Sequence, residues 1–352
     1  MMDKKENYLR TVRFERPEYI HMLFHINNSC WGHYPHDALQ DLMEAHSFLF
    51  PDFVRKNEPI VIDHPPFVSS KAPWVDPWGN TWEISIDGIL GAVTEHALGS
   101  WDQFESFSPP DPGKTTHWSP IDWQEAAESK NPIGFIDFMK CGEIGHGHTF
   151  LKLCDTRGYQ NLLYDMMDGE PRLLELIGML DEFNLGQVRN YLDIVGVEHM
   201  GYAEDLGMQV GPMLSPELFR KYIKPSYEKI IQPAKDAGCI IHMHSDGDIR
   251  LLMDDILDCG VDIINLQDLV NGIDWIAEKL AGKVCIDLDV DRQDIMMNGT
   301  PAQVDSLILE EIEKLGSKEG GLMLCQGVYP AISLENIEAA MDAMEKYAGY
   351  YS

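Results

Sequence analysis

The chain has 352 residues, of which 44% are hydrophobic, and this is enough for one barrel-sized domain with a large core. Its formal net charge of −31 makes nucleic acid an unexpected partner, because a field of that sign repels phosphate backbones. The apolar runs are no longer than a strand, so we expect no membrane-spanning segment. The first residues lack the apolar core of a signal peptide. The 7 cysteines are widely spaced without a Cys-x-x-Cys motif, and we therefore expect a cytoplasmic protein without disulfides.

Residues 1–130 have an irregular pattern that is rich in proline and tryptophan. Helices are predicted at Asp37–Phe48 and near Trp123–Lys130, and a turn at Asp76–Asn80 precedes a short predicted strand at Thr81–Ile86. The density of aromatic residues argues for an ordered segment and against a disordered tail. We therefore predict that residues 1–130 form an N-terminal extension packed on the main domain.

From residue 131 to residue 352, strand-like and helix-like segments alternate. The predicted strands are Ile133–Met139, His199–Glu204, Cys239–His244, Val261–Leu266, Val284–Leu288 and Gly321–Cys325. The predicted helices are Asn161–Asp165, Pro171–Tyr191, Ser215 to Gly238 with bends at Pro225 and Pro233, Ile249–Cys259, Thr300 to Leu315, and Ser333 to Tyr347. Repeated βα units indicate a parallel sheet, and no strand is followed by the Gly-x-Gly-x-x-Gly motif of dinucleotide-binding folds. Polar residues recur at several strand ends, which favours a (β/α)8 TIM barrel, and residues 131–352 are expected to form the main part of this single barrel domain.

The stretch Cys239–Asp248 is the most informative part of the chain. A short apolar run ends in two histidines and two aspartates, directly before a predicted helix. Chemistry in parallel α/β folds takes place at the C-terminal ends of the strands, and ionisable groups are costly to place there unless they bind or react. We expect His242 and His244 to face opposite sides of the strand, with His244 pointing into the barrel. Asp248 is expected to cap the helix that follows.

Three chemical interpretations of this strand end remain open. The first is a zinc site, because histidine, thiolate and carboxylate are zinc ligands and catalytic zinc keeps one open position. The second is acid–base catalysis without a metal, because histidine titrates near neutrality and a carboxylate can orient it. The third is a purely structural role for the aspartates as helix caps. The candidate metal ligands are His242, His244, Cys325 and Glu204, and the candidate catalytic residues are His244, Asp246 and Asp205.

A series of motifs in the C-terminal half resembles the uroporphyrinogen decarboxylase superfamily. The motifs occur in the order of that family: Leu206–Gln209, Ser215–Arg220, Lys224-Pro225, His244–Gly247, Gly260–Asn265, Asp287–Asp289, Gly299–Pro301 and Leu334–Ile337. In the N-terminal half, Asn7–Arg13 with Arg16-Pro17, and Asp76–Asn80, match more loosely. The resemblance implies a (β/α)8 barrel whose active site lies at the C-terminal mouth.

The superfamily contains decarboxylases of uroporphyrinogen and methyltransferases that use a corrinoid. The decarboxylases carry an arginine-rich loop near the N-terminus that holds the carboxylates of the substrate. The corresponding segment here, Ile26–His33, contains no arginine. A substrate with many carboxylates needs cationic partners, so the methyltransferase branch is favoured. Decarboxylation in porphyrin biosynthesis remains the alternative.

The motif His244-Ser-Asp-Gly247 carries Asp246 where the thiol-specific zinc methyltransferases of the superfamily carry a cysteine. The resemblance therefore implies O-demethylation, in which a methyl group moves from a methoxylated (or other methylated) small molecule to a cobalamin-type corrinoid. A corrinoid-binding partner protein would supply that corrinoid, and zinc is a candidate cofactor. The candidate substrate-binding residues are Asn27, Trp31, Gln209, Asn265 and Gln267.

Overall fold

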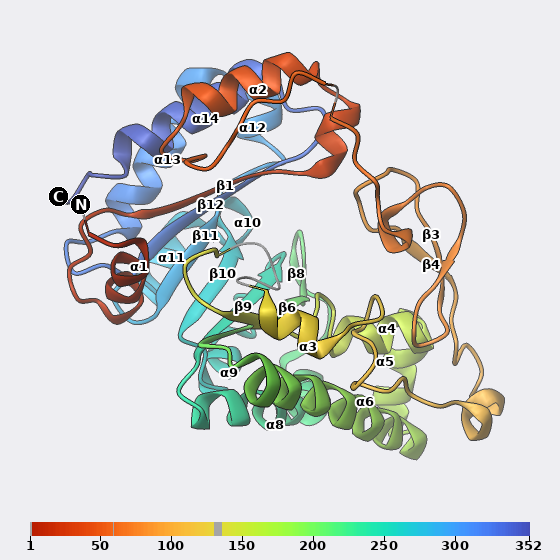
Figure 1. Cartoon of the computed structure of the whole chain (residues 1–352). Coiled ribbons are helices and arrows are strands. Elements are labelled where there is room, and N and C mark those ends of the chain that lie inside the picture. Colours follow the sequence, from red (N-terminus) through yellow and green to blue (C-terminus); the bar gives the residue numbers. More distant parts are fainter. Residues whose placement is uncertain (1, 59, 130–135) are drawn as a thin grey trace. The chain divides into compact units, whose positions relative to one another are not determined.

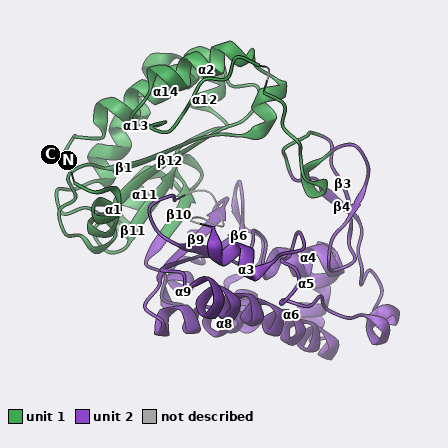
Figure 2. Ribbon diagram, in the orientation of Figure 1, with its two compact units in different colours: residues 1–69, 86–89, 264–352 green, residues 70–85, 90–263 purple. Residues whose placement is uncertain are grey.

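The computed structural model describes residues 2–58, 60–129 and 136–352. The chain forms two compact units, which Figure 2 shows in different colours. Unit 1 comprises residues 1–69, 86–89 and 264–352, and unit 2 comprises residues 70–85 and 90–263. The sequence-based boundary near residue 130 remains a prediction.

Unit 1 is built on parallel strands in the order β1-β12-β11-β10. These strands are β1 (His21–Ile26), β10 (Ile263–Gln267), β11 (Cys285–Asp289) and β12 (Leu322–Val328). The assignment of residues 21–26 to an irregular extension was wrong, because β1 pairs with β12 in parallel along its whole length. Met22, Phe24 and Ile26 are buried on one face of β1, and this alternation is what a strand with one covered face requires.

The helices of unit 1 are α1 (Lys4–Arg13), α2 (His36–Ala45), α10 (Asp268–Asn271), α11 (Ile273–Lys279), α12 (Ile295–Asn298), α13 (Pro301–Leu315) and α14 (Leu334–Tyr347), with short 3-10 turns at Asn28–Gly32 and Pro66–Val68. Two of these helices, α13 and α14, begin at the side-chain caps that the sequence indicated. Thr300 and Gln303 form a reciprocal capping box at the start of α13, and Ser333 caps α14. Figure 1 shows α13 and α14 packed together over β1 and β12.

Unit 2 contains three further parallel strands in the order β9-β6-β5. They are β5 (Cys141–Glu143), β6 (His199–Asp205) and β9 (Ile240–Asp246). The predicted strands at residues 199–204 and 239–244 are therefore confirmed. A small antiparallel sheet of β2 (Trp74–Val75), β3 (Thr81–Glu83) and β4 (Ala92–Glu95), and a hairpin of β7 (Gly207–Met208) and β8 (Gly211–Pro212), complete the strands of this unit.

Helices cover one side of the parallel strands of unit 2. They are α3 (Trp123–Glu128), α4 (Phe150–Arg157), α5 (Tyr159–Asp168), α6 (Pro171–Asn190), α7 (Pro216–Leu218), α8 (Lys224–Asp236) and α9 (Met253–Asp258), with a 3-10 turn at Trp101–Ser106 and π-helical turns at Tyr191–Val195 and Phe219–Ile223. Figure 1 shows α6 and α8 side by side, and these two helices are in contact. Pro225 lies in the first turn of α8, directly after a π-helical turn, and Pro233 lies inside α8, so the helix continues past both prolines.

The helix that was predicted from Ile249 begins only at Met253, and Leu252 occupies its N-cap position. Asp248 is therefore not the helix cap. Its carboxylate instead accepts hydrogen bonds from the backbone and the guanidinium of Arg250, and both carboxylate oxygens are engaged. The loop between β9 and α9 is longer than expected. The side chain of Asp248 accepts a hydrogen bond from a backbone N–H of its own loop, and such local hydrogen bonds compete with helix formation.

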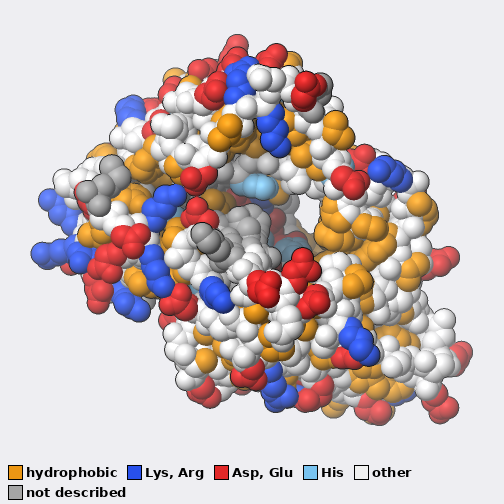
Figure 3. Space-filling view, viewed as in Figure 1, with side chains coloured by type: hydrophobic (Ala, Val, Ile, Leu, Met, Phe, Trp, Pro, Cys, Tyr) orange, Lys and Arg blue, Asp and Glu red, His pale blue; other side chains and the backbone are white. Residues whose placement is uncertain are grey.

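The seven parallel strands define a TIM-barrel-like α/β fold, but within the described residues they do not make a closed eight-stranded barrel. The predicted strand Ile133–Met139 lies partly outside the described residues, and residues 137–139 form bends, so the strand at this point is β5. In the described part of the chain, no helix is long and apolar enough to cross a bilayer. Figure 3 shows acidic side chains spread over the visible face with basic ones among them.

Candidate functional site

The site is built on one face of the parallel strands in unit 2. Burial alternates along β6 and β9, so Gly201, Ala203 and Asp205 share a partly exposed face with the histidines and the aspartate of β9. The register places the two strands level with one another: Gly201↔His242, Ala203↔His244 and Asp205↔Asp246. We call this the site face. On this face β6 carries His199, then the small residues Gly201 and Ala203, and Asp205 at its end.

The alternation corrects one prediction. His242 and His244 are two positions apart on β9 and lie on the same face, not on opposite faces. His242 lies deeper in the strand, with its ring 5.4 Å from the ring of His199. His244 lies nearer the C-terminal end of β9, where it meets Asp205 and Asp246.

Three side chains converge at the C-terminal ends of the strands: His146, Asp205 and His244. Asp205 Oδ1 lies 3.1 Å from His146 Nε2 and 3.5 Å from His244 Nε2. The three candidate ligand atoms all lie within 4.8 Å of one another. Two imidazole nitrogens and one carboxylate oxygen are donor types that zinc accepts, and three protein ligands leave an open position for a substrate. We call these residues the metal cluster, and their geometry fits a divalent cation.

The electrostatics of the metal cluster follow from this proximity. Burial alone would raise the pKa of Asp205, but the hydrogen bonds to His146 and His244 outweigh burial and hold this pKa below its ordinary value. Burial opposes the charged form of His146, yet the hydrogen bond to Asp205 raises the pKa of His146. The cluster therefore attracts positive charge, whether that charge is a proton or a cation. A bound cation would displace the proton from the imidazole.

Asp246 lies next to the metal cluster. One of its carboxylate oxygens is 3.8 Å from His244 Nε2, and its backbone N–H donates to Asp205 Oδ1 over 3.3 Å. The carboxylate of Asp246 is partly exposed. It is thus near the predicted metal position without belonging to the three ligand groups.

Two glycines hold the ends of β6 and β9 together. Gly247 has a φ of +80°, and a Cβ built on it would lie 2.1 Å from the carbonyl carbon of Gly207. The loops also exchange hydrogen bonds, from the Asp248 N–H to the Met208 carbonyl at 2.7 Å and from the Leu206 N–H to Ser245 Oγ at 2.9 Å. Only glycine permits this backbone approach and conformation, which explains the last residue of the His244-Ser-Asp-Gly247 motif.

Glu204, a predicted metal ligand, points to the opposite face of β6 from Asp205. It is fully buried, and its carboxylate accepts hydrogen bonds from the backbone N–H groups of Thr149 and Phe150 and from the Tyr227 hydroxyl, at 2.5, 2.8 and 3.1 Å. Burial raises the pKa of Glu204 to about 7 against these three donors. The structure thus makes Glu204 an anchor for the start of α4, because adjacent residues of a strand face opposite sides.

The other predicted site residues lie elsewhere in the fold. Gln209 is exposed at the turn of the β7-β8 hairpin in unit 2. In unit 1, Asn27 caps the turn that contains Trp31, Asn265 on β10 donates to the Asp287 carbonyl, and Cys325 lies on β12. Gln267 ends β10. The substrate-binding roles of these residues, and a role of Cys325 as a metal ligand, remain predictions.

Sequence reasoning missed His146 and its neighbour Glu143. Both belong to Cys141-Gly-Glu-Ile-Gly-His-Gly-His148, which begins as β5 and ends in polar residues, like the stretch on β9. A three-residue strand is too short to produce a periodic signal. The signal that was available is the pair of histidines alternating with glycines.

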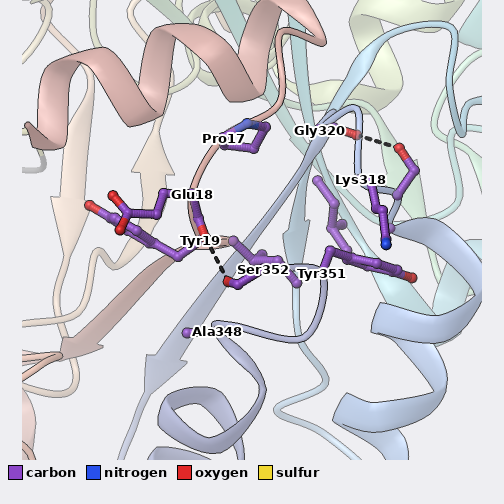
Figure 4. A pocket seen from close by; sticks show the side chains of 12 residues that line it. Pro17, Glu18, Tyr19, Lys318, Gly320, Ala348, Tyr351 and Ser352 are labelled. Atoms are coloured by element: carbon purple, nitrogen blue, oxygen red, sulfur yellow. Dashed lines mark hydrogen bonds between the residues drawn. The ribbon is translucent and has the colours of Figure 1, made fainter. Parts of the chain in front are cut away.

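A small pocket also exists in unit 1, and Figure 4 shows it from close by. It lies beside Ile20 and Leu322, at the N-terminal ends of β1 and β12, and Ser352 Oγ donates to the Glu18 carbonyl at its edge. Catalytic groups of parallel α/β folds come from the opposite ends of the strands. The pocket is therefore not the candidate site.

The fold and site define a TIM-barrel-like α/β protein with a histidine–aspartate cluster at its strand ends. Comparison with protein families matches residues 150–347 to uroporphyrinogen decarboxylase (URO-D), and the chain belongs to this family. Among solved structures, a methyltransferase from Methanosarcina mazei shares the fold, with a TM-score of 0.63, 14% sequence identity and coverage of 99% of both chains. A B12-independent methionine synthase from a Shewanella species is more distant, with a TM-score of 0.41 and 12% identity over 67% of this chain and 69% of that one. A search of curated proteins finds no significant match.

Proposed function

We propose that this protein transfers a methyl group from a methoxylated or otherwise methylated small molecule to the corrinoid of a partner protein. The observation that carries the proposal is the metal cluster of His146, Asp205 and His244, with Asp246 beside it. Membership of the URO-D family and the shared fold of the methanogen methyltransferase support it. The partner, the methyl donor and a cytoplasmic location belong to the proposal.

Zinc is the cofactor that we propose for this cluster. Held by the two imidazole nitrogens and the Asp205 carboxylate, zinc would supply a Lewis acid that polarises the oxygen of the methyl donor. The cluster contains no thiolate, so its ligands are harder than those suited to activating a thiol. The site therefore suits a leaving oxygen better than a thiol substrate.

The residues of the chain then have distinct tasks in the reaction. A bound Co(I) corrinoid would supply the electron pair for the new bond to the methyl carbon, while the carbon–oxygen bond of the donor would break. The oxygen keeps the pair of that bond and takes a proton, because a bare phenolate has a conjugate-acid pKa of about 10 and leaves reluctantly. Asp246 is placed to provide this proton, since it lies beside the cluster without being one of its ligands. Without a metal, His244 oriented by Asp205 would serve as the acid.

The second candidate function is decarboxylation, which the family name favours. The site face argues against decarboxylation of a polycarboxylate, because Glu143, Asp205 and Asp246 place three carboxyl groups on this face. A polycarboxylate substrate would need cations there. Turnover of uroporphyrinogen by the purified protein would establish this alternative.

Two measurements test the proposal. Methylation of free cob(I)alamin by methoxylated arenes, methylamines and thioethers is followed by absorbance, and Asp205→Asn is expected to lower the rate at least about tenfold. Metal analysis should find zinc in the wild-type protein and a loss of it in His146→Ala. A Cys325→Ser variant shows whether the thiol is an additional ligand. Failure of every donor to methylate cob(I)alamin would refute the proposed function.

A further inference from the structure

Glu143 lies on the site face, one level deeper than the metal cluster. The register of β5 places Glu143 next to Gly201 of β6, and Gly201 is in turn level with His242 of β9. A Cβ built on Gly201 would lie 3.2 Å from Cγ of Glu143. Because glycine has no side chain, the side chain of Glu143 occupies the space over β6, between the two outer strands of the site.

The carboxyl group of Glu143 is partly buried. Within the described residues, no hydrogen bond or ion pair reaches it, whereas Glu204 in the adjacent strand receives three hydrogen bonds. Burial raises the pKa of Glu143, although the nearby His146, His242 and His244 act to lower this pKa. A partly buried carboxyl without a donor is costly unless a ligand or water supplies one. The surroundings of Glu143 therefore indicate that a bound molecule supplies the hydrogen-bond donor for its carboxyl group.

We propose that Glu143 is a substrate-binding residue that accepts a hydrogen bond from a hydroxyl or amino group of the methyl donor. This inference rests on the proposed function and specifies its substrate class. Glu143 and His242 stand two residues below His244 in the register, which corresponds to about 7 Å along the strands. That separation is comparable to the span of one six-membered ring.

The methyl donor is then a small ring compound with the methylated oxygen at one end and a hydrogen-bond donor at the other. Ala203, level with His244, forms the floor under the ring, and Glu143 over Gly201 lies at the far end of the ring. A donor with a carboxylate in place of the hydroxyl would set two negative groups against each other at Glu143. The site is therefore selective for neutral or cationic donors.

The test compares two probes that differ in one group: 4-methoxyphenol, which has a hydroxyl opposite the methoxyl, and 1,4-dimethoxybenzene, which does not. We expect wild-type protein with cob(I)alamin to favour 4-methoxyphenol in kcat/KM. Glu143→Gln should reduce this preference about tenfold, mainly through KM, since a hydrogen bond to a charged group is lost. Glu143→Ala serves as a second variant. Glu95→Gln, an exposed carboxyl of the same unit, is the matched control and should leave the preference unchanged.

Two further readouts distinguish substrate binding by Glu143 from other roles. The zinc content would fall in Glu143→Gln if Glu143 were a metal ligand, and the thermal midpoint would fall if its role were structural. We expect the zinc content and the thermal midpoint to be unchanged in this variant. Equal discrimination between the probes in wild type and variant would overturn the inference. Should wild-type protein methylate no cob(I)alamin, the proposed function fails separately. Calorimetric titration with 4-methoxyphenol then decides: binding weakened about tenfold by Glu143→Gln supports the inference, and equal or absent binding refutes it.

Discussion

Replacement of Glu204 by glutamine should remove a pH dependence from the stability of unit 2. The Glu204 carboxyl is fully buried, and burial raises its pKa from 4.5 to about 7 despite the N–H groups of Thr149 and Phe150 and the hydroxyl of Tyr227. A raised folded-state pKa means that the folded protein holds the proton more tightly than the unfolded chain. The stabilisation is complete below about pH 4.5, declines as pH rises and is gone above about pH 7. At about 1.4 kcal/mol per pH unit, this interval corresponds to about 3 kcal/mol.

The assay is urea unfolding of wild type and Glu204→Gln at several pH values between 4.5 and 8, with the two free energies of unfolding subtracted at each pH. Glutamine keeps the shape and one acceptor oxygen but cannot titrate, so the wild-type advantage should fall by about 3 kcal/mol across the range. Glu182→Gln is the control, because the exposed Glu182 pairs with Lys229 and its pKa is lowered, which gives the opposite sign. Parallel curves for wild type and Glu204→Gln would show that Glu204 does not hold a proton in the folded protein.

Two further substitutions test the packing around the site. Gly247→Ala forces a Cβ against the backbone of Gly207 at positive φ and should lower the free energy of unfolding by about 2–4 kcal/mol, whereas Gly169→Ala, also at positive φ but with nothing within 4 Å, should cost only about 1 kcal/mol. An equal loss of unfolding free energy in the two variants would show that the close approach of Gly247 to Gly207 does not require glycine. Lys152→Met leaves the buried carboxylate of Asp76 without its cation 3.4 Å away, and should cost about 3–5 kcal/mol; an unchanged thermal midpoint would contradict this.

The polar end of β9 could be predicted from sequence because its signal is local. An apolar run of strand length, followed by two histidines and an aspartate within five residues, marks a buried strand that ends at a site, whatever surrounds it. The alternation of βα units likewise depends only on hydrophobic periodicity. The strand β9 and the alternation of βα units are confirmed, as is the family, and the role of the strand end as a site stays a prediction.

The prediction went wrong where a short segment or a face had to be assigned. Residues 21–26 carry histidines among apolar residues, so the strand β1 was not recognised until its pairing with β12 was seen. Residues two apart share a face of a strand, so His242 and His244 belong together, and the contrary expectation was an error in applying the alternation.

By itself, the sequence determined the α/β class of fold, the family and the polar end of β9, because these depend on patterns within a few residues of one another. Only the tertiary structure decided that His146 joins Asp205 and His244, and that Glu143 lies over Gly201 while Glu204 turns to the helices. These outcomes depend on the register of three strands that are about 40 to 100 residues apart in the chain. A one-residue shift in that register would carry each carboxyl group to the other face and dismantle the site.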